Sequence, residues 1–405
     1  MGIQSSEAGV IIVGAGPVGL MTALLLSEQG IEWRLIASEP VLAGDLRAST
    51  FHPPTLDLLG RLGLAEPLIA EGLVSPTWQV RLHATGERAE FDLSVIADDT
   101  DHPFRLQCEQ SRLCAMVLER LQADPKGTLM LGWTVDGVTA DETGVAVTAR
   151  PVDAPGADPQ TFRARYLIGA DGSRSVVRRA MGIGFEGMTY PETTILATSD
   201  FPFQDHLPGL SNVNYVWKDG GTFSLLRLRH LWRCSLYPDQ GETIEEALQP
   251  ESIAQKLRAI VPEAADRAPM EVRPYRVHMR IADDYRADRV LLAGDAAHVN
   301  SPAGGMGMNG GIHDAAELAA TLGEVWRGAP EALLDRYTRR RRPVAEQEML
   351  AQADRNRARM QERDPERRRA LLADLQRIAG DRDLAREHLL RTSMITGLRR
   401  AAAVA

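Results

Sequence analysis

Three observations on the sequence predict an α/β fold that combines a nucleotide-binding domain, a mixed β-sheet domain and C-terminal helices. Near the N-terminus, a glycine-rich turn lies between a β-branched run and a helical segment. The middle of the chain carries runs of alternating apolar and polar residues, which are typical of an antiparallel sheet. From about residue 330 onward, the composition is helical and rich in arginine and glutamate.

The bulk composition is that of an ordinary globular protein. The chain has 405 residues, of which 44% are hydrophobic and 25% charged, a length that suits two or three domains. A net charge of -9 argues against general nucleic-acid binding. Cys108, Cys114 and Cys234 have no metal-ligand spacing, so we expect reduced thiols and no metal site. We expect no membrane span and a cytoplasmic location, because no long apolar stretch or signal peptide is present.

A dinucleotide-binding signature occupies residues 14–19, directly after the β-branched run at 10–13 and before a helical segment. Gly14 permits the tight turn, and Gly16 lets the backbone approach a pyrophosphate. Gly19 lets the helix and the strand pack closely. The helix N-terminus would then face the phosphates.

The second strand, residues 33–37, departs from this signature. An acid about 20 residues downstream of the glycines usually binds the adenosine ribose, but Ala37 stands at the matching position. The nearest carboxylate is Glu39, on the same face of the strand as residue 37. Either Glu39 substitutes from farther out or the ribose is held less well, and the sequence leaves both open.

A strand, a carboxylate and a glycine-rich loop follow one another within residues 289–314. The apolar run 290–293 is typical of a buried parallel strand, and Asp295 follows where that strand ends. Pro302 and five glycines come next, ahead of an apolar helical pattern that starts near Ile312. This order fits a polar cofactor lying across a strand end.

The sheet domain is predicted from a hairpin signal at residues 218–221, between alternating runs at 213–217 and 222–228. If Trp217 pairs with Thr222, alternate residues of both strands share one face. Strand alternation alone makes the following residues candidates for a small-molecule pocket, although a solvated face is at least as common: Asn214, Arg227 and Tyr237.

Other segments complete the outline. Residues 77–93 and 132–149 predict short strands, 109–122 a helix, and 166–170 a buried strand that runs into an Asp-Gly turn with serines able to cap a following helix. The arginine clusters at 339–342 and 367–369 favour solvated, salt-bridged helices over a nucleic-acid patch.

Three motifs stand in a fixed order along the chain: GAGPVG at 14–19, GADGSRSVVR at 169–178 and AGDAAHVNSPAGGMGMNGG at 293–311. Together they resemble the class A flavoprotein monooxygenases, the family of p-hydroxybenzoate hydroxylase and phenol hydroxylase. The resemblance extends over about residues 10–342 and is closest to the short members without a thioredoxin-like C-terminal domain.

The resemblance implies a domain division. A GxGxxG Rossmann-like FAD-binding domain would comprise residues 1–75, 100–185 and 275–325, and a mixed β-sheet substrate domain residues 76–99 and 186–274. Residues 326–405 would form a C-terminal helical region.

It also implies a reaction. FAD would be reduced by NADH or NADPH and react with oxygen to a C4a-hydroperoxide, which hydroxylates an aromatic or similarly activated small molecule. The expected partners are that substrate and O2, with no nucleic acid, in a monomer or homodimer. Two alternatives are a flavin oxidoreductase of the same fold that uses reduced flavin from a separate reductase, and a non-catalytic flavin-binding protein.

Residues of the family motifs carry over to positions in this chain. Asp295 would hold the ribityl chain, Asp171 would serve both FAD and NAD(P)H, and Val135 would lie near the adenine. Pro302 and residues 304–309 would lie along the isoalloxazine ring. The implied cofactor-binding residues are Gly14, Gly16, Pro17, Val18, Gly19, Arg47, Gln110, Val135, Asp171, Asp295, Pro302, Gly304, Gly305, Gly307, Met308 and Asn309.

The sequence assigns no catalytic side chain, because the flavin carries the hard chemistry. A base is needed only if a phenol must be ionised, and His278, Tyr237 or a buried water chain could serve. His298, within the GDAAH segment, is expected to be structural.

Overall fold

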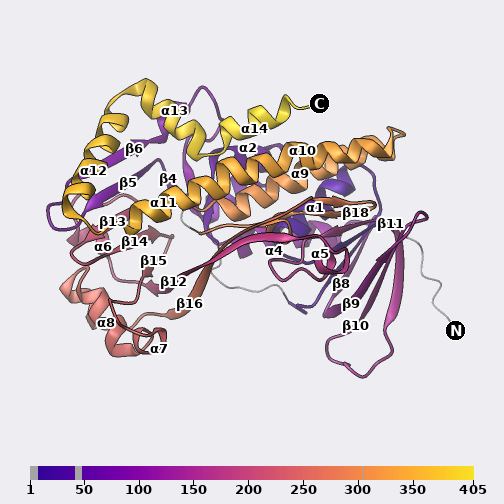
Figure 1. Cartoon of the computed structure of the whole chain (residues 1–405), viewed down its shortest axis with the longest axis horizontal. Helices are drawn as coiled ribbons and strands as arrows, with labels where there is room; N and C mark the ends of the chain where they lie inside the picture. The colour runs from indigo at the N-terminus through magenta and orange to yellow at the C-terminus, as the bar shows by residue number, and fades with distance from the viewer. Residues whose placement is uncertain (1–7, 42–47, 303) are drawn as a thin grey trace.

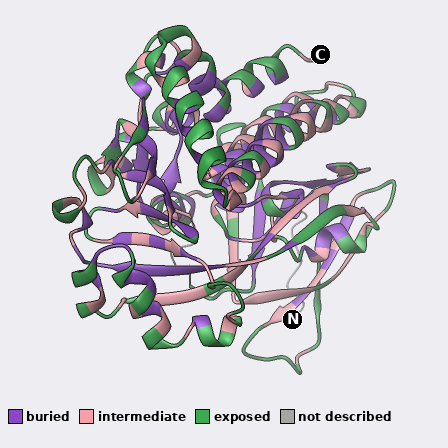
Figure 2. Ribbon diagram, turned by 60° about the vertical axis from the view of Figure 1, so that its left-hand side comes forward, coloured by how far each residue is buried: buried purple, intermediate pink, exposed green. Residues whose placement is uncertain are grey.

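A computed structural model of the chain describes residues 8–41, 48–302 and 304–405. Within these ranges, two eight-stranded sheets and one three-stranded sheet are flanked by helices, which confirms the predicted α/β fold with C-terminal helices (Figure 1). Buried residues concentrate in the sheets and on the inward faces of the helices, and the outward faces are exposed (Figure 2). No helix in the described ranges is both long and apolar enough to cross a membrane.

The first sheet has a parallel core. Strand β1 (Ala8–Val13) pairs in parallel with β2 (Trp33–Ala37) and β11 (Gln160–Gly169), and α1 (Pro17–Glu28) connects β1 to β2. On either side the parallel order continues through β8 (Gly127–Leu131) and β18 (Val290–Leu292). Because these strands are parallel, the residues that follow β1, β2, β11 and β18 meet at one edge of the sheet.

Antiparallel strands extend this sheet. They are β9 (Trp133–Ala140) and β10 (Val145–Pro151) beyond β11, and β17 (Arg286–Ala287) beside β18.

The second sheet is mixed and has the order β19-β16-β12-β15-β14-β13-β5-β6. Its longest strands, β12 (Phe185–Ser199) and β16 (Glu271–Ala282), run side by side from the first sheet to the far end of the second (Figure 1). The remaining strands are β5 (Thr77–Leu82), β6 (Arg88–Asp92), β13 (Val213–Lys218), β14 (Gly221–Arg227), β15 (Trp232–Leu236) and β19 (His298–Val299). Trp217 lies opposite Thr222 across the hairpin, which confirms the predicted register.

Shorter elements connect the sheets. The third sheet consists of β3 (Thr50–Phe51), β7 (Arg105–Gln107) and β4 (Leu73–Ser75). The α-helices of this part of the chain are α2 (Pro53–Arg61), α3 (Ala65–Glu71), α4 (Gln110–Gln122), α5 (Val176–Ala180), α6 (Phe203–His206), α7 (Ile244–Ala247) and α8 (Pro250–Arg258). The Ser175 hydroxyl accepts a hydrogen bond from the Arg178 amide, so a serine caps α5 as expected.

Helix α9 (Met306–Trp326) begins six residues before the predicted start near Ile312, because the glycine-rich segment itself is helical. Its glycines are required by close packing rather than by a loop. A Cβ on Gly311 would meet Val18 Cγ2 at 2.5 Å, and one on Gly310 would meet Met349 Sδ at 2.3 Å. The glycines therefore let α9 pack closely against α1 and the C-terminal helices.

The chain beyond α9 is helical, as predicted, and its helices lie along one side of the molecule (Figure 1). They are α10 (Asp335–Val344), a π-helical turn η5 (Ala345–Leu350), α11 (Ala351–Gln361), α12 (Pro365–Gly380), α13 (Arg382–Thr392) and α14 (Ile395–Ala402).

The arginine clusters are only partly solvated, which corrects the sequence-based interpretation. The Arg367 side chain is 75% exposed, whereas Arg341 is 2% and Arg368 6% exposed. Arg368 donates hydrogen bonds to the carbonyl oxygens of Lys218 and Gly221. A buried guanidinium needs such acceptors, so these arginines attach the C-terminal helices to the rest of the fold.

A buried ion cluster joins the end of β18 to helices α9 and α10. Asp314 Oδ1 lies 2.7 Å from Arg341 Nε, and Asp314 Oδ2 lies 2.6 Å from His298 Nε2 and accepts a hydrogen bond from the Gly294 amide at 3.1 Å. Burial alone would raise the pKa of the Asp314 carboxyl. The charges and hydrogen bonds of His298 and Arg341 outweigh burial and hold this pKa below its usual range. His298 is therefore part of the scaffold, as the sequence suggested.

We predict that Asp314→Ala lowers the free energy of unfolding by about 3–5 kcal/mol, because it leaves Arg341 buried without its carboxylate. Urea unfolding followed by circular dichroism measures the change. The matched control is Asp374→Ala, which removes an exposed carboxylate paired with Arg377 and should change stability by less than about 0.5 kcal/mol. Equal effects of the two substitutions would contradict the prediction.

Candidate functional site

A cavity of about 560 Å³ connects the strand ends of the first sheet with the inner face of the second. Its lining comes from segments far apart in the sequence: the turn after β1, the end of β2, the first residue of α4, the turns after β11 and β18, the sheet strands and α11. The cavity therefore lies where the topology brings the sequence motifs together.

The turn after β1 forms one end of the cavity. Gly14 has φ +110°, and a Cβ there would lie 2.3 Å from the Ala170 carbonyl oxygen. Gly16 faces the cavity, and a Cβ there would meet no protein atom within 4 Å. Pro17 and Val18, in the first turn of α1, also line the cavity. The space beside Gly16, at a helix N-terminus, fits a phosphate group.

Gly19 has a different role from the other two glycines. A Cβ on Gly19 would lie 1.9 Å from the Gly14 carbonyl oxygen. It is not among the residues that line the cavity. Its contribution is the close approach of helix and strand that the signature requires.

The end of β2 lies at the same end of the cavity. Ala37, Ser38 and Glu39 all line it, together with Val135. The Ser38 hydroxyl donates a hydrogen bond to Glu39 Oε2 at 3.1 Å. Glu39 thus lines the same end of the cavity as the glycine turn, as the first of the two interpretations of Ala37 requires.

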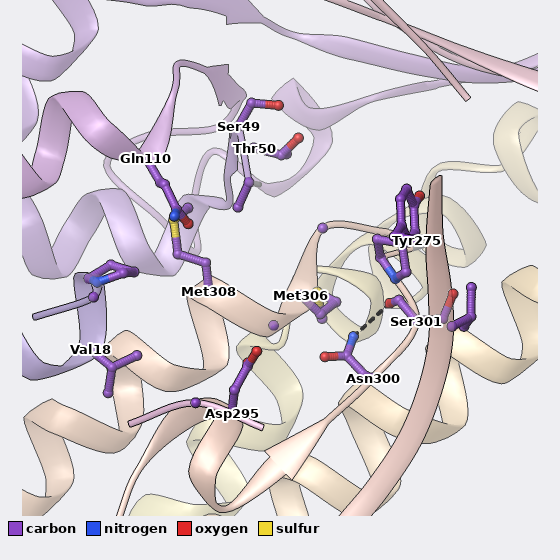
Figure 3. A pocket seen from close by; sticks show the side chains of 18 of the residues that line it. Val18, Ser49, Thr50, Gln110, Tyr275, Asp295, Asn300, Ser301, Met306 and Met308 are labelled. Carbon is purple, nitrogen blue, oxygen red and sulfur yellow. Dashed lines mark hydrogen bonds between the residues drawn. The ribbon is translucent and has the colours of Figure 1, made fainter. Parts of the chain in front are cut away.

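Asp295 projects into the middle of the cavity. It follows β18 in a short helical turn, and Figure 3 shows its carboxylate pointing toward the space beside Met306 and Met308. The preceding Gly294 has φ +61°, and its amide is held by Asp314. The buried ion cluster therefore sets the direction in which Asp295 points.

The segment before α9 and the first turn of α9 form another wall of the cavity. Pro302, Gly304, Gly305, Gly307 and Met308 line the cavity. Asn309 lies behind them, fully buried.

Two buried side chains hold this wall in place. His52 Nε2 donates to the Gly304 carbonyl oxygen at 2.8 Å, and Asn309 Oδ1 accepts from the His52 amide at 2.9 Å. Burial, with the charge of Arg105 nearby, lowers the pKa of His52 to about 3, so its ring stays neutral.

Two further predicted residues lie at the cavity, and one cannot be placed. Gln110, the first residue of α4, lines it. Asp171 also lines it, and its Oδ2 accepts hydrogen bonds from the Val176 and Val177 amides, which fixes the carboxylate at the start of α5. Arg47 lies outside the described residues.

The inner face of the second sheet closes the other end of the cavity with polar and apolar side chains. The polar residues are Thr194, Tyr215, Ser224, Arg233, Ser235, Tyr237 and Tyr275. The apolar residues of the sheet are Val213, Leu226 and Val277, and Met306 of α9 and Met360 of α11 also line the cavity. Such a surface can hold an aromatic ring and hydrogen-bond its substituents.

The structure corrects the choice of sheet face. With Trp217 opposite Thr222, the face that carries Tyr215 and Ser224 lines the cavity. Asn214 and Arg227 alternate with these residues and point away. Asn214 is fully buried and donates to the carbonyl oxygens of Ser211 and Leu225, and Arg227 lies over the Trp232 ring.

Of the two candidate bases, one lines the cavity. His278 does not, and its Nδ1 is 2.9 Å from the Thr189 hydroxyl near the other end of the β12–β16 pair. Tyr237 does line the cavity, but burial, with Tyr275 beside it, raises the pKa of its hydroxyl well above the usual value. Tyr237 therefore stays protonated and is suited to donate a hydrogen bond.

Several cavity residues were missed by sequence reasoning. Arg357, Met360 and Gln361 come from α11, in a region without any motif. Tyr275 and Val277 occupy alternate positions of β16, so period-2 alternation could have suggested them. Nothing in the sequence shows that α11 folds back over the second sheet.

Comparison with known proteins places the chain in a family. A family model described as "FAD binding domain" matches residues 7–353. Para-nitrophenol 4-monooxygenase of Pseudomonas sp. (strain WBC-3) is 33% identical in an alignment of 398 residues that covers 96% of this chain and 96% of that protein. Pentachlorophenol 4-monooxygenase of Sphingobium chlorophenolicum is 32% identical over 348 residues, covering 85% of this chain and 63% of that protein.

A solved structure agrees with this placement. The p-nitrophenol 4-monooxygenase from Pseudomonas putida DLL-E4 superposes with a TM-score of 0.88 at 31% identity, covering 96% of this chain and 98% of that one. The chain therefore belongs to the FAD-dependent aromatic hydroxylases, the class A flavoprotein monooxygenases. The glycine turn with open space at Gly16 and the carboxylate of Asp295 within the same cavity fit FAD.

We predict that Gly16→Ala folds normally yet weakens FAD binding by about tenfold or more, because its methyl group would project into the space left for the pyrophosphate. Thermal unfolding without cofactor measures the fold, and flavin fluorescence titration measures the affinity. The companion variant Gly14→Ala should lose stability, because its Cβ would clash with Ala170. Unchanged FAD affinity in Gly16→Ala would contradict this use of the glycine turn.

We also predict that Asp295→Ala raises the FAD dissociation constant about 10- to 100-fold, the range expected for loss of a charge-assisted hydrogen bond. The flavin content of the purified protein and a fluorescence titration measure it. Asp283→Ala, which removes a carboxylate outside the cavity lining, is the control. Wild-type flavin occupancy in Asp295→Ala would remove Asp295 from the cofactor site.

Proposed function

We propose that this protein hydroxylates a small single-ring phenol, with NADH or NADPH as the reductant. The observation that carries the proposal is the continuity of the cavity from Gly16, past Asp295, to the tyrosines and apolar side chains of the second sheet. Two relatives, a para-nitrophenol 4-monooxygenase and a pentachlorophenol 4-monooxygenase, support a phenol with an electron-withdrawing substituent.

The chain's own residues would have three tasks. The edge of the first sheet would hold FAD through the glycine turn, Glu39 and Asp295. Bound FAD would supply the chemistry, namely acceptance of reducing equivalents and activation of oxygen. The second sheet and Met360 would exclude water around the ring, which protects reactive species from hydrolysis. Tyr237 and Tyr275 would orient a phenol by hydrogen bonds.

The domain division is part of the proposal. We assign FAD binding to residues 1–75, 100–185 and 275–325, and substrate binding to 76–99 and 186–274, with residues 326–405 as the helical region. The sheet membership of β5 and β6 supports the placement of 76–99 with the second sheet. Cavity residues from α11 extend the substrate role into the helical region. A cytoplasmic location and a monomeric or homodimeric state remain predictions from the sequence.

The test is substrate-stimulated oxidation of NADH or NADPH by the FAD-loaded protein, with oxygen uptake and product identification by mass spectrometry. We expect stimulation by 4-nitrophenol and related phenols, with one ring oxygen added per turnover. Tyr237→Phe should lower kcat/KM by about 5- to 10-fold through loss of one hydrogen bond. The control Tyr190→Phe alters a hydroxyl bound to Asp354, outside the cavity lining. Oxidation of NADH or NADPH that no phenol stimulates would contradict the proposal.

A further inference from the structure

A second, much smaller cavity adjoins the main one behind the wall before α9. Its volume is about 10 Å³, which is room for one water-sized particle. Four residues, Arg105, Tyr215, Gly304 and Met306, line both cavities. The small cavity is completed by Trp78, Gln352, Asn356, Arg359 and Thr392. It therefore lies between β7, β13 and the C-terminal helices.

Two guanidinium groups face this small cavity. Arg105 is 4% exposed, its guanidinium lies 5.1 Å from the centre of the Trp78 ring, and its Nε has no hydrogen-bond partner in the described part of the chain. Arg359 comes from α11, and its Nη2 donates to Asn356 Oδ1 at 2.9 Å. Its Nε is likewise buried without a partner among the described residues.

Neither guanidinium has a carboxylate ion-pair partner in the ranges that the structure describes. Tyr215 interacts electrostatically with both guanidinium groups, and its hydroxyl oxygen accepts a hydrogen bond from Arg105. More positive charge surrounds the pair. Burial, together with Arg391, Arg359, Arg105 and Arg355, lowers the pKa of His388 to about 3, so this neighbouring ring stays neutral.

Two other buried arginines of the described chain, Arg341 and Arg368, have such partners, whereas Arg34 is buried with its Nε and Nη1 unpartnered. Arg341 pairs with Asp314, and Arg368 donates to three carbonyl oxygens. Arg105 and Arg359 differ from Arg34 because both line one small cavity, where two uncompensated buried charges are strongly unfavourable. Guanidinium N–H groups are donors only, so the group that would complete the site is an acceptor with negative charge.

We propose that the small cavity binds a monovalent anion of about the size of a halide, held between Arg105 and Arg359. The Tyr215 hydroxyl and the edge of the Trp78 ring complete its surroundings. Because Gly304 and Met306 line both cavities, the anion stabilises the wall of the cofactor cavity from behind. Two sources share this chemistry: a free ion from solution, or an ionised substituent on the ring of a substrate that reaches in from the main cavity.

The direct test is a bromide soak of crystals of the FAD-loaded protein, followed by anomalous diffraction. We expect an anomalous peak between Arg105 and Arg359 in the wild type and none there in Arg359→Gln, which removes one of the two charges that line the small cavity. The control Arg367→Gln, at an exposed arginine of α12, should retain the peak. Absence of the peak in the wild type, or its persistence in Arg359→Gln, would overturn the proposal.

A solution measurement covers the case in which the variant does not crystallise. Bromide quenches indole fluorescence, and Trp78 lines the site, so titration at constant ionic strength should give a saturable decrease that Trp78→Phe removes. We expect at least tenfold weaker bromide binding in Arg359→Gln with normal FAD content, and wild-type binding in Arg367→Gln. Quenching that is linear, or equal in all variants, would count against the site.

Neither readout requires turnover, so a failure of the proposed substrate class would leave this test intact. A final experiment, which does rest on the proposed phenol substrate, distinguishes a free ion from an ionised ring substituent. Displacement of bromide by 4-hydroxybenzoate but not by phenol would assign the site to a ring substituent. Retention of bromide with both would assign it to a free ion. Displacement by both to the same extent would show that the bromide occupies the main cavity and would overturn the assignment.

Discussion

At the back of the cavity, the buried carboxylate of Asp314 accepts hydrogen bonds from Arg341, the His298 ring and the Gly294 amide. Three elements meet there: the end of β18, helix α9 and helix α10. Burial of a charge is unfavourable unless its hydrogen bonds are complete, so this arrangement permits little variation in the turn that follows β18. The direction of Asp295, which lies within that turn and lines the cavity, depends on it.

Buried polar side chains near the start of α9 also have hydrogen-bond partners. The Asn309 side chain donates a hydrogen bond to the Thr50 carbonyl oxygen and accepts one from the His52 amide. The His52 ring in turn donates to the Gly304 carbonyl oxygen. Glycines at 310 and 311 allow the neighbouring side chains of Met349 and Val18 to approach the helix. The start of α9 is thus held by the hydrogen bonds of Asn309 and His52 and by the packing of Val18 and Met349 against its glycines.

The C-terminal helices supply residues to both cavities. Helix α11 lies over β13 and β14 and places Arg357, Met360 and Gln361 at the main cavity and Arg359 at the small one. The Trp217 indole donates to the Arg359 carbonyl oxygen at 3.0 Å, which fixes this helix against the sheet. Residues that line the main cavity therefore come from a region that carries no family motif.

The sequence by itself determined the parts of this protein that depend on local rules. Backbone geometry requires glycine at 14 and close packing requires it at 19, and alternation with turn chemistry predicts the Trp217–Thr222 register. These rules act over a few residues, so a single chain reveals them.

Only the tertiary structure decided which face of the hairpin meets the cavity, because alternation defines two faces and α11 covers one of them. It also decided that Arg341 and Arg368 are buried while Arg367 is solvated. The three side chains are identical, so their burial depends on contacts with residues distant in the sequence. The helical state of residues 306–311 belongs here as well. Glycine disfavours a helix intrinsically, and it is tolerated at 310 and 311 because Met349 of η5 and Val18 of α1 occupy the space that side chains there would need.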